Sequence, residues 1–233
     1  MPRMLKPGEL PDHLPRGGLV WVQGCSAWSS VVETEIAMAA DRLSGTTFTG
    51  IFVPGLNPAS RLLGGGRRLH GFFATPEMEA AGPAADMLPL CYADLSDHLQ
   101  GLTIDAACFM VAPPDSRGIC SFGPVCDFLP DLWQRIPVRI GVINPCLPRT
   151  RGTAGIPLSD FSGLIEDDRD LPAVGSGSDD ATRAIAARLA GLVPDGATLQ
   201  IGLGRTPEGA LAGLHGHRGL AIHSGLIGDA VVD

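Results

Sequence analysis

Three short segments of small and polar residues follow apolar runs of the chain, in positions suited to ligand binding. They are Gln23-Gly-Cys-Ser-Ala27, Ala112-Pro-Pro-Asp-Ser-Arg-Gly118 and Gly202-Leu-Gly-Arg205. Each begins where a stretch with strand character ends, and α/β folds bind their ligands at the carboxyl ends of strands. Each segment alone is a weak signal. Together they predict that these three junctions contribute to one or more binding sites.

Arginines near two glycine-rich segments have two interpretations each. The guanidinium of Arg205 suits bidentate binding of a carboxylate or a phosphate, but a solvated surface arginine fits the sequence equally well. The cluster Arg61, Arg67 and Arg68 surrounds Gly64-Gly-Gly66 and could hold a phosphate. For this cluster, a solvated loop is the favoured interpretation.

Six cysteines are spread along the chain: Cys25, Cys91, Cys108, Cys120, Cys126 and Cys146. No pair has C-x-x-C spacing, and no histidine lies at zinc-ligand spacing from one of them. We therefore predict reduced thiols and no metal site. Small hydrophobes in a core are the favoured role, with a catalytic cysteine as the alternative.

The elements that must position these segments alternate between strands and helices. Apolar runs predict strands over Leu19–Val22, Phe48–Val53, Ile104–Val111 and Val138–Ile143, with helices over about 31–43 and 128–135. Strands that are apolar along their whole length are typical of sheets buried on both faces. The alternation with helices predicts a layered α/β fold with a largely parallel sheet.

The small, polar stretch Leu171–Asp180 predicts a linker between two domains. After it we expect a helix over 180–193, a strand over Thr198–Gly202, a helix from Pro207 and a strand over Leu220–His223. One βαβ unit leaves open strand edges and an uncovered face, so we expect either that another chain completes it or that the sequence is part of a longer protein. The predicted organisation is an extension over 1–18, an α/β domain over 19–175 and an incomplete second α/β domain over 180–233.

Charge and hydropathy exclude several kinds of partner. The formal net charge is −8, whereas a nucleic-acid-binding protein needs clustered positive charge. No segment has the roughly 20 apolar residues that cross a bilayer. Residues 1–18 have the pattern of neither a secretory signal nor an anchor. We predict a cytoplasmic protein with no nucleic-acid and no membrane partner.

Three longer motifs resemble the acetyl-CoA hydrolase/transferase family, which includes 4-hydroxybutyrate CoA-transferases. The first, Val111-Ala-Pro-Pro-Asp-Ser-Arg-Gly-Ile-Cys-Ser-Phe-Gly123, is similar to the family's S-P-P-D-x-x-G-x-x-S-x-G. The second, Ile143-Asn-Pro-Cys-Leu-Pro-Arg-Thr150, is similar to V-N-x-x-M-P-R-T. The third, Pro194-Asp-Gly-Ala-Thr-Leu-Gln-Ile-Gly-Leu-Gly204, is similar to P-D-G-A-T-L-Q-x-G-I-G. The resemblance covers nearly the whole chain from Leu19 onward and identifies it with the N-terminal half of the family.

The resemblance implies a fold, a ligand and a mechanism. The fold is a three-layer sheet-and-helix, NagB/RpiA-like domain followed by the start of a second, similar domain. The ligand is coenzyme A in an acyl-CoA substrate. Family members transfer CoA through a glutamyl thioester, which splits one hard exchange into easier steps. A G-x-G-G loop presents backbone N–H groups to the oxyanion, which implies catalytic roles for Gly202, Gly204 and Arg205. The residues implied to bind substrate or CoA are Gly24, Ser26, Pro114, Asp115, Ser224 and Gly225.

Two departures from the family pattern fall in this implied active site. The family's nucleophile lies in a motif close to I-H-[ST]-E-M, and this chain has Ile222-His-Ser-Gly-Leu226, with Gly225 in place of the glutamate. Arg205 also stands at the fourth position of the loop, where the family has glycine. Glu208 is favoured as a helix N-terminal residue and His223 as a packed histidine. Ser224 has no recognisable triad partner.

The departures leave several functions open. The first is one subunit of a CoA-transferase or acyl-CoA hydrolase, completed by a second chain or by self-association and without a covalent glutamate step on this chain. The second is a non-catalytic pseudo-enzyme subunit that stabilises or regulates an active partner. A third is a transferase that uses a glutamate of the partner chain.

Overall fold

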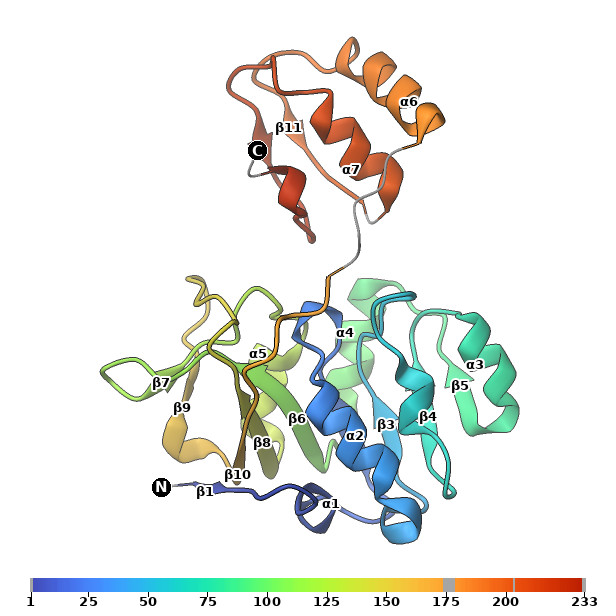
Figure 1. The fold of residues 1–233 in the computed structure, drawn as a ribbon, viewed down its shortest axis with the longest axis vertical. Coiled ribbons are helices and arrows are strands. Elements are labelled where there is room, and N and C mark those ends of the chain that lie inside the picture. Colours follow the sequence, from blue (N-terminus) through green and yellow to red (C-terminus); the bar gives the residue numbers. More distant parts are fainter. Residues whose placement is uncertain (1, 174–178, 203, 232–233) are drawn as a thin grey trace. The chain divides into compact units, whose positions relative to one another are not determined.

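The computed structural model describes residues 2–173, 179–202 and 204–231 of the chain (Figure 1). It divides into two compact units, which we call the first unit (Met1–Ala173) and the second unit (Val174–Asp233). The predicted linker over 171–180 contains residues 174–178, which lie outside the described residues. Among the residues described, no helix is long and apolar enough to cross a membrane.

The first unit is built on an eight-stranded sheet in which every neighbouring pair of strands is parallel. From one edge to the other, the strands are β1 (Arg3–Met4), β10 (Gly163–Glu166), β8 (Val138–Ile143), β6 (Ala106–Val111), β2 (Leu19–Val22), β3 (Thr47–Thr49), β4 (Arg68–Gly71) and β5 (Ala85–Met87). The predicted α/β fold with a parallel sheet is thus confirmed.

Helices cover both faces of this sheet and make three layers. One apolar cluster includes residues of α1 (Leu10–His13), α2 (Ser30–Met38) and α3 (Pro76–Ala81). The other includes residues of α4 (Tyr92–Gly101) and α5 (Leu129–Leu132). All six residues of β6 are buried, with Cys108 in the first cluster and its neighbour Phe109 in the second. This alternation explains why β6 reads as a continuous apolar run.

The order of the strands reverses between β2 and β6. From β2 the chain proceeds through β3 and β4 to the edge strand β5, and it then returns to place β6 on the other side of β2. β8 and β10 continue outward from β6. Loops that leave β2 and β6 therefore diverge, and the crevice at such a reversal point is the usual ligand site of an open α/β sheet. We use the name β2/β6 crevice for the carboxyl ends of these two strands and the loops that leave them.

Hydrogen bonds fix the start of α2, which follows the loop after β2. The Ser29 hydroxyl accepts from the Val32 N–H at 3.3 Å and donates to the Asp167 carboxylate at 3.1 Å. An N-cap of this kind satisfies one of the free N–H groups of the first turn. α2 ends at Met38, and residues Ala40–Leu43 form a 3₁₀ turn, so the helix predicted over 31–43 exists but is shorter.

The N-terminal residues differ from the sequence prediction. The sequence predicts an extension over 1–18, whereas β1 pairs with β10 at the edge of the sheet and Leu10 and Leu14 are buried in the core. A two-residue edge strand carries no periodicity that would have predicted it.

The described residues of the second unit form two α-helices and two strands. In chain order they are α6 (Asp180–Ala190), β11 (Thr198–Leu199), α7 (Arg205–Ala212) and β12 (Ala221–Ile222). β11 and β12 are parallel and form a two-stranded sheet. Asp179 caps α6 by accepting from the Thr182 N–H at 2.8 Å. A methyl group at Gly209 would lie 2.4 Å from the Thr182 side chain, so a glycine lets α7 approach α6 closely.

Candidate functional site

Gln23 joins the two strands of the β2/β6 crevice through its side chain. It directly follows β2 and is buried. Its side-chain carbonyl accepts from the Met110 N–H of β6 at 2.8 Å, and its amide donates to the Val125 carbonyl at 2.8 Å. One side chain thus joins β2, β6 and the segment that leads to Asp127.

The backbone of Gly24 leaves no room for a side chain. A methyl group there would lie 1.9 Å from the Ile51 carbonyl oxygen. Cys25 adopts a left-handed φ of 52°. The Asn57 side chain bonds to both backbone polar groups of Cys25. Asn57 accepts from the Cys25 N–H at 2.9 Å and donates to the Cys25 carbonyl at 2.9 Å. Ser26 follows in a 3₁₀ turn, half-buried.

Asp127 lies close enough to Cys25 and Tyr92 to influence both. It has a left-handed φ of 43°, and its Oδ2 atom is buried with no hydrogen-bond partner among the described residues. Burial raises the pKa of this carboxyl group to about 6. Burial and then Asp127 raise the pKa of Cys25 to about 12. Burial, then Asp127 and Cys25, raise the pKa of Tyr92 to about 12.

These pKa values decide between two chemical roles. A thiol with a pKa near 12 carries almost no thiolate at neutral pH, so Cys25 does not have the character of a nucleophile. A carboxyl group with a pKa near 6 can gain or lose a proton near neutrality. Asp127 is therefore a carboxyl group near Cys25 that can change its charge near neutral pH. Sequence reasoning missed it because its electrostatic influence on Cys25 joins residues far apart in the chain.

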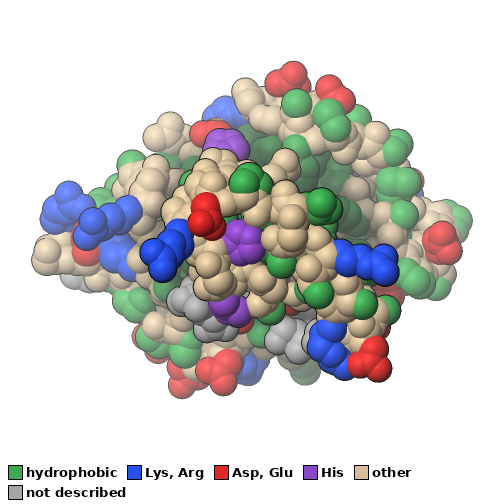
Figure 2. All heavy atoms as spheres, turned by 90° about the horizontal axis from the view of Figure 1, so that it is seen from above, with side chains coloured by type: hydrophobic (Ala, Val, Ile, Leu, Met, Phe, Trp, Pro, Cys, Tyr) green, Lys and Arg blue, Asp and Glu red, His purple; other side chains and the backbone are tan. Residues whose placement is uncertain are grey.

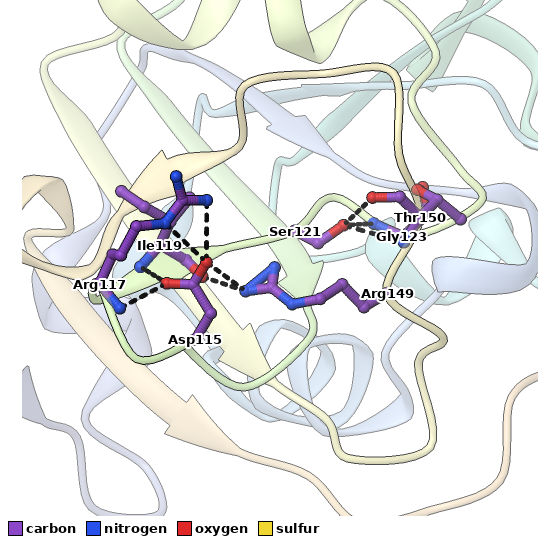
Figure 3. Close-up of polar contacts among 7 residues, drawn as sticks. All are labelled: Asp115, Arg117, Ile119, Ser121, Gly123, Arg149 and Thr150. Atoms are coloured by element: carbon purple, nitrogen blue, oxygen red, sulfur yellow. Dashed lines mark hydrogen bonds and ion pairs between the residues drawn. The ribbon is translucent and has the colours of Figure 1, made fainter.

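The junction after β6 is organised by Asp115 (Figure 3). Its carboxylate accepts from the Arg117 and Ile119 N–H groups, both at 2.9 Å. It also forms ion pairs with Arg117 at 3.2 Å and Arg149 at 3.6 Å. Hydrogen bonds from Ile119 and Arg117 lower the pKa of Asp115. Asp115 thus keeps its charge and holds two guanidinium groups, while its neighbour Pro114 is exposed.

Hydrogen bonds link two of the motifs that resemble the family, residues 111–123 and 143–150 of the first unit. The Ser121 hydroxyl accepts from the Gly123 N–H at 3.1 Å and from the Thr150 N–H at 3.3 Å (Figure 3). The Thr150 hydroxyl donates to the Gly123 carbonyl at 2.6 Å. The segment that follows leads to Val125, whose carbonyl accepts from Gln23 at the end of β2. One stretch of chain therefore runs from the Arg149 side to the crevice.

The cluster of Arg61, Arg67 and Arg68 is engaged within the protein. Arg61 pairs with buried Glu33 at 2.7 Å, and Arg68 pairs with Asp86 at 2.8 Å. Arg67 is buried and donates to the Leu62 carbonyl at 2.9 Å and the Leu63 carbonyl at 2.7 Å. The interpretation as a solvated loop is wrong for Arg67, because its side chain is buried and its guanidinium bonds to two carbonyl groups of the loop.

The glycine loop of the second unit leads into α7. Gly204 has a φ of 123°, which an L-residue rarely adopts, and it is the N-cap of the helix. Arg205 is exposed at the first position of α7 and helps lower the pKa of Asp179, after hydrogen bonds from Thr182. Glu208 lies in the first turn, as predicted. A cation at a helix N-terminus adds to the positive potential there, which favours an anion.

Ser224 and Gly225 follow β12. The Ser224 hydroxyl is bonded to both backbone groups of Ile201 and so joins this loop to the glycine loop. At Gly225, a methyl group would have no atom within 4 Å, so the glycine is not required for packing. His223 is exposed, and the prediction of a packed histidine is therefore wrong.

The structure thus places the implied site residues in two groups. Gly24, Ser26, Pro114 and Asp115 lie at the carboxyl ends of β2 and β6 in the first unit. In the second unit, the described members follow β11 and β12, which are Gly202, Gly204, Arg205, Ser224 and Gly225. No cluster of three or more metal-ligating side chains occurs among the residues described.

Comparisons with curated proteins give one consistent result. Over 137 residues, 57% of this chain, the sequence is 35% identical to the 4-hydroxybutyrate coenzyme A transferase of Clostridium kluyveri. Over 139 residues, it is 34% identical to the succinyl-CoA:acetate/propanoyl-CoA:succinate CoA transferase of Fasciola hepatica. The chain is a relative of the CoA-transferases. The resemblance predicted from the sequence is confirmed, although no family model matches the chain.

Solved structures confirm the fold of this CoA-transferase relative. The 4-hydroxybutyrate CoA-transferase of Porphyromonas gingivalis superposes with a TM-score of 0.77 at 26% identity, covering 99% of this chain and 56% of that one. RipA of Yersinia pestis gives 0.87 at 21% identity, covering 99% and 58%. The aligned residues make up only 31% and 28% of the two curated transferases. The chain thus spans little more than half of these structures, and about a third or less of each curated relative is matched.

Proposed function

We propose that this chain is a subunit of a CoA-transferase-like or acyl-CoA hydrolase-like enzyme that acts on an acyl-CoA thioester. A second chain or a second copy completes it, and no glutamyl-CoA thioester forms on this chain. The observation that carries the proposal is the relationship to CoA-transferases, combined with Gly225 where the family motif has glutamate. The enzyme's reaction then needs an oxyanion site but no carboxylate nucleophile from this chain.

The geometry of the glycine loop supports the proposed action on an acyl-CoA thioester. Gly204 turns the chain with a φ of 123° directly before α7. The first N–H groups of a helix have no partner within it and can donate to a negatively charged oxygen. The reciprocal bonds between Ser224 and Ile201 fix the loop that carries residue 225 to the residue directly before the glycine loop. The second unit thus retains support for an oxyanion site.

The second unit also supports completion by another chain. Its sheet has two strands in the part of the chain that the structure describes, so both are edge strands. Leu192 is 78% exposed and Ile227 is 61% exposed. Open edges and exposed large apolar side chains favour association with further polypeptide.

Binding of acyl-CoA tests the proposal. The affinity of the full chain for acetyl-CoA and succinyl-CoA is measured by calorimetry, with any copurifying partner retained. Gly204→Val forces a branched side chain into a left-handed position, so we expect it to weaken binding of both thioesters by about tenfold, a loss of ~1.4 kcal/mol. Gly216→Ala is the matched control, because a methyl group at Gly216 meets no atom within 4 Å.

The same binding measurement distinguishes an enzyme subunit from a pseudo-enzyme subunit. If the chain binds neither thioester and Gly204→Val changes nothing, the pseudo-enzyme subunit becomes the better account. The observation that favours this alternative is again Gly225, which removes the family's nucleophile. Thioester binding that depends on Gly204 would argue for the enzyme.

A further inference from the structure

A cavity lies beside the Asp115 site in the first unit. Its volume is about 470 Å³, and it is bounded by the turn around Arg117 and by the segment from Arg149 to Gly155. Pockets for drug-sized ligands fall in the range of roughly 300–1,000 Å³. We call it the arginine cavity.

The charges that line the arginine cavity are mostly positive. Three guanidinium groups, of Arg117, Arg149 and Arg151, face one carboxylate, that of Asp115. The local balance is therefore +2 in a chain whose formal net charge is −8. Asp115 pairs with two of the arginines, and Arg151 forms no ion pair or hydrogen bond with any described residue. Figure 2 shows Lys and Arg side chains gathered at one edge of the molecule, on the side where β7 lies in Figure 1.

The backbone of the cavity wall adds donors to these charges. Within the described residues, the N–H groups of residues 151–155 donate no hydrogen bond. Gly152 and Gly155 have φ values of 122° and 73°. A methyl group at Gly155 would lie 2.4 Å from the Cys120 carbonyl oxygen, so the glycine lets this loop lie against β7 (Ile119–Cys120). Unpaired N–H groups next to guanidinium groups are the donors that phosphate oxygens bind.

We propose that the arginine cavity binds a phosphate-bearing ligand, which in the proposed function is the nucleotide end of CoA. The volume of the arginine cavity exceeds that needed for a single carboxylate. Its local net charge of +2 is equal in size and opposite in sign to that of a phosphate dianion. A continuous segment, from Ser121 to Asp127, connects the cavity with the β2/β6 crevice. The proposed phosphate site therefore belongs to the same connected set of loops as the carboxyl ends of β2 and β6.

Binding of CoA and of its parts to the full chain tests this inference, which rests on the proposed function only for the source of the phosphate. The probes are CoA, dephospho-CoA, pantetheine, inorganic phosphate and pyrophosphate, measured by calorimetry at two salt concentrations. Arg151→Ala removes one charge-assisted contact, so we expect CoA to bind about tenfold more weakly and pantetheine to bind unchanged. Arg151→Lys should recover part of the loss. Arg16→Ala is the matched control, because Arg16 is exposed and precedes β2 at the opposite end of the sheet.

The outcomes separate this inference from the proposed function. Weaker binding of phosphate and pyrophosphate by Arg151→Ala, with CoA not bound at all, supports a phosphate site and contradicts the proposed function. If CoA and pantetheine bind to wild type while Arg151→Ala changes the affinity of no phosphate-bearing probe, the proposed function stands and the arginine cavity is not a phosphate site. Failure of every probe to bind contradicts both.

Discussion

The Ser224 hydroxyl donates to the Ile201 carbonyl at 2.9 Å and accepts from the Ile201 N–H at 3.1 Å. The reciprocal pair joins the loop after β12 to the residue that precedes the glycine loop. The hydroxyl group thus donates to one backbone group and accepts from another. This geometry gives Ser224 a structural role. The position of residue 225 depends on these two hydrogen bonds.

Replacing Ser224 by alanine tests that role. Two backbone groups of Ile201 would lose their partner, so we expect the second unit to lose about 1–2 kcal/mol of stability. Hydrogen exchange of the N–H groups of β11 and β12 measures this loss, with Ser96→Ala on α4 as the control. Unchanged exchange in the second unit, combined with loss of activity, would instead indicate that Ser224 takes part in the chemistry.

Gly24 should tolerate no side chain. Its added methyl group would lie 1.9 Å from the Ile51 carbonyl oxygen, so the strand ends of β2 and β3 would have to separate. We expect Gly24→Ala to cost at least about 2 kcal/mol of unfolding free energy. Gly101→Ala is the matched control, because a methyl group at Gly101 meets no atom within 4 Å. Denaturant unfolding of both variants measures the difference, and equal stabilities would show that the loop after β2 adapts.

Asp127 should make the protein less stable as the pH rises. Its pKa is about 6 in the folded protein and 3.8 in the reference state, so folding favours the protonated form. Its contribution is most favourable below about pH 4, is lost as the pH rises towards 6, and is constant above, with an upper bound of about 3 kcal/mol. Asp127→Asn should remove this dependence and raise the melting temperature near pH 7. Asp97→Asn, an exposed carboxylate on α4, is the control, and parallel pH profiles of Asp127→Asn and wild type would refute the assignment.

The cysteines should differ in reactivity. Burial first of all raises the pKa of Cys25 and Cys108 to about 12 and that of Cys120 to about 11. Cys91 and Cys146 are exposed. Because the thiolate is the reacting species, iodoacetamide near neutral pH should modify the two exposed residues first. Peptide mass spectrometry over time measures the order, and early modification of Cys25 would restore it as a candidate nucleophile.

Local patterns predicted the centre of the fold better than its edges. The strands Leu19–Val22 and Val138–Ile143 have the predicted bounds, because continuous apolar runs mark a sheet buried on both faces. β1 and β7 have two residues each, too few for any periodicity. The prediction for Phe48–Val53 extended too far, since β3 ends at Thr49.

The candidate site shows the same limit more clearly. Motifs predicted which loops follow β2 and β6, and the parallel sheet brings those loops to one edge. The effect of Asp127 on Cys25 depends on packing between distant segments, and so does the pairing of Arg149 with Asp115. No local pattern encodes such contacts.

The central claim is that no glutamyl-CoA thioester forms on this chain, because position 225 holds glycine. The most direct test incubates the full chain, with any copurifying partner, with acetyl-CoA and succinyl-CoA, followed by hydroxylamine trapping and peptide mass spectrometry. Gly225→Glu serves as the comparison, since the open space around Gly225 accepts a larger side chain. The account predicts no modified glutamate in wild type and a modified residue 225 in the variant. A trapped adduct on Glu208 or any other glutamate of the wild-type chain would contradict it.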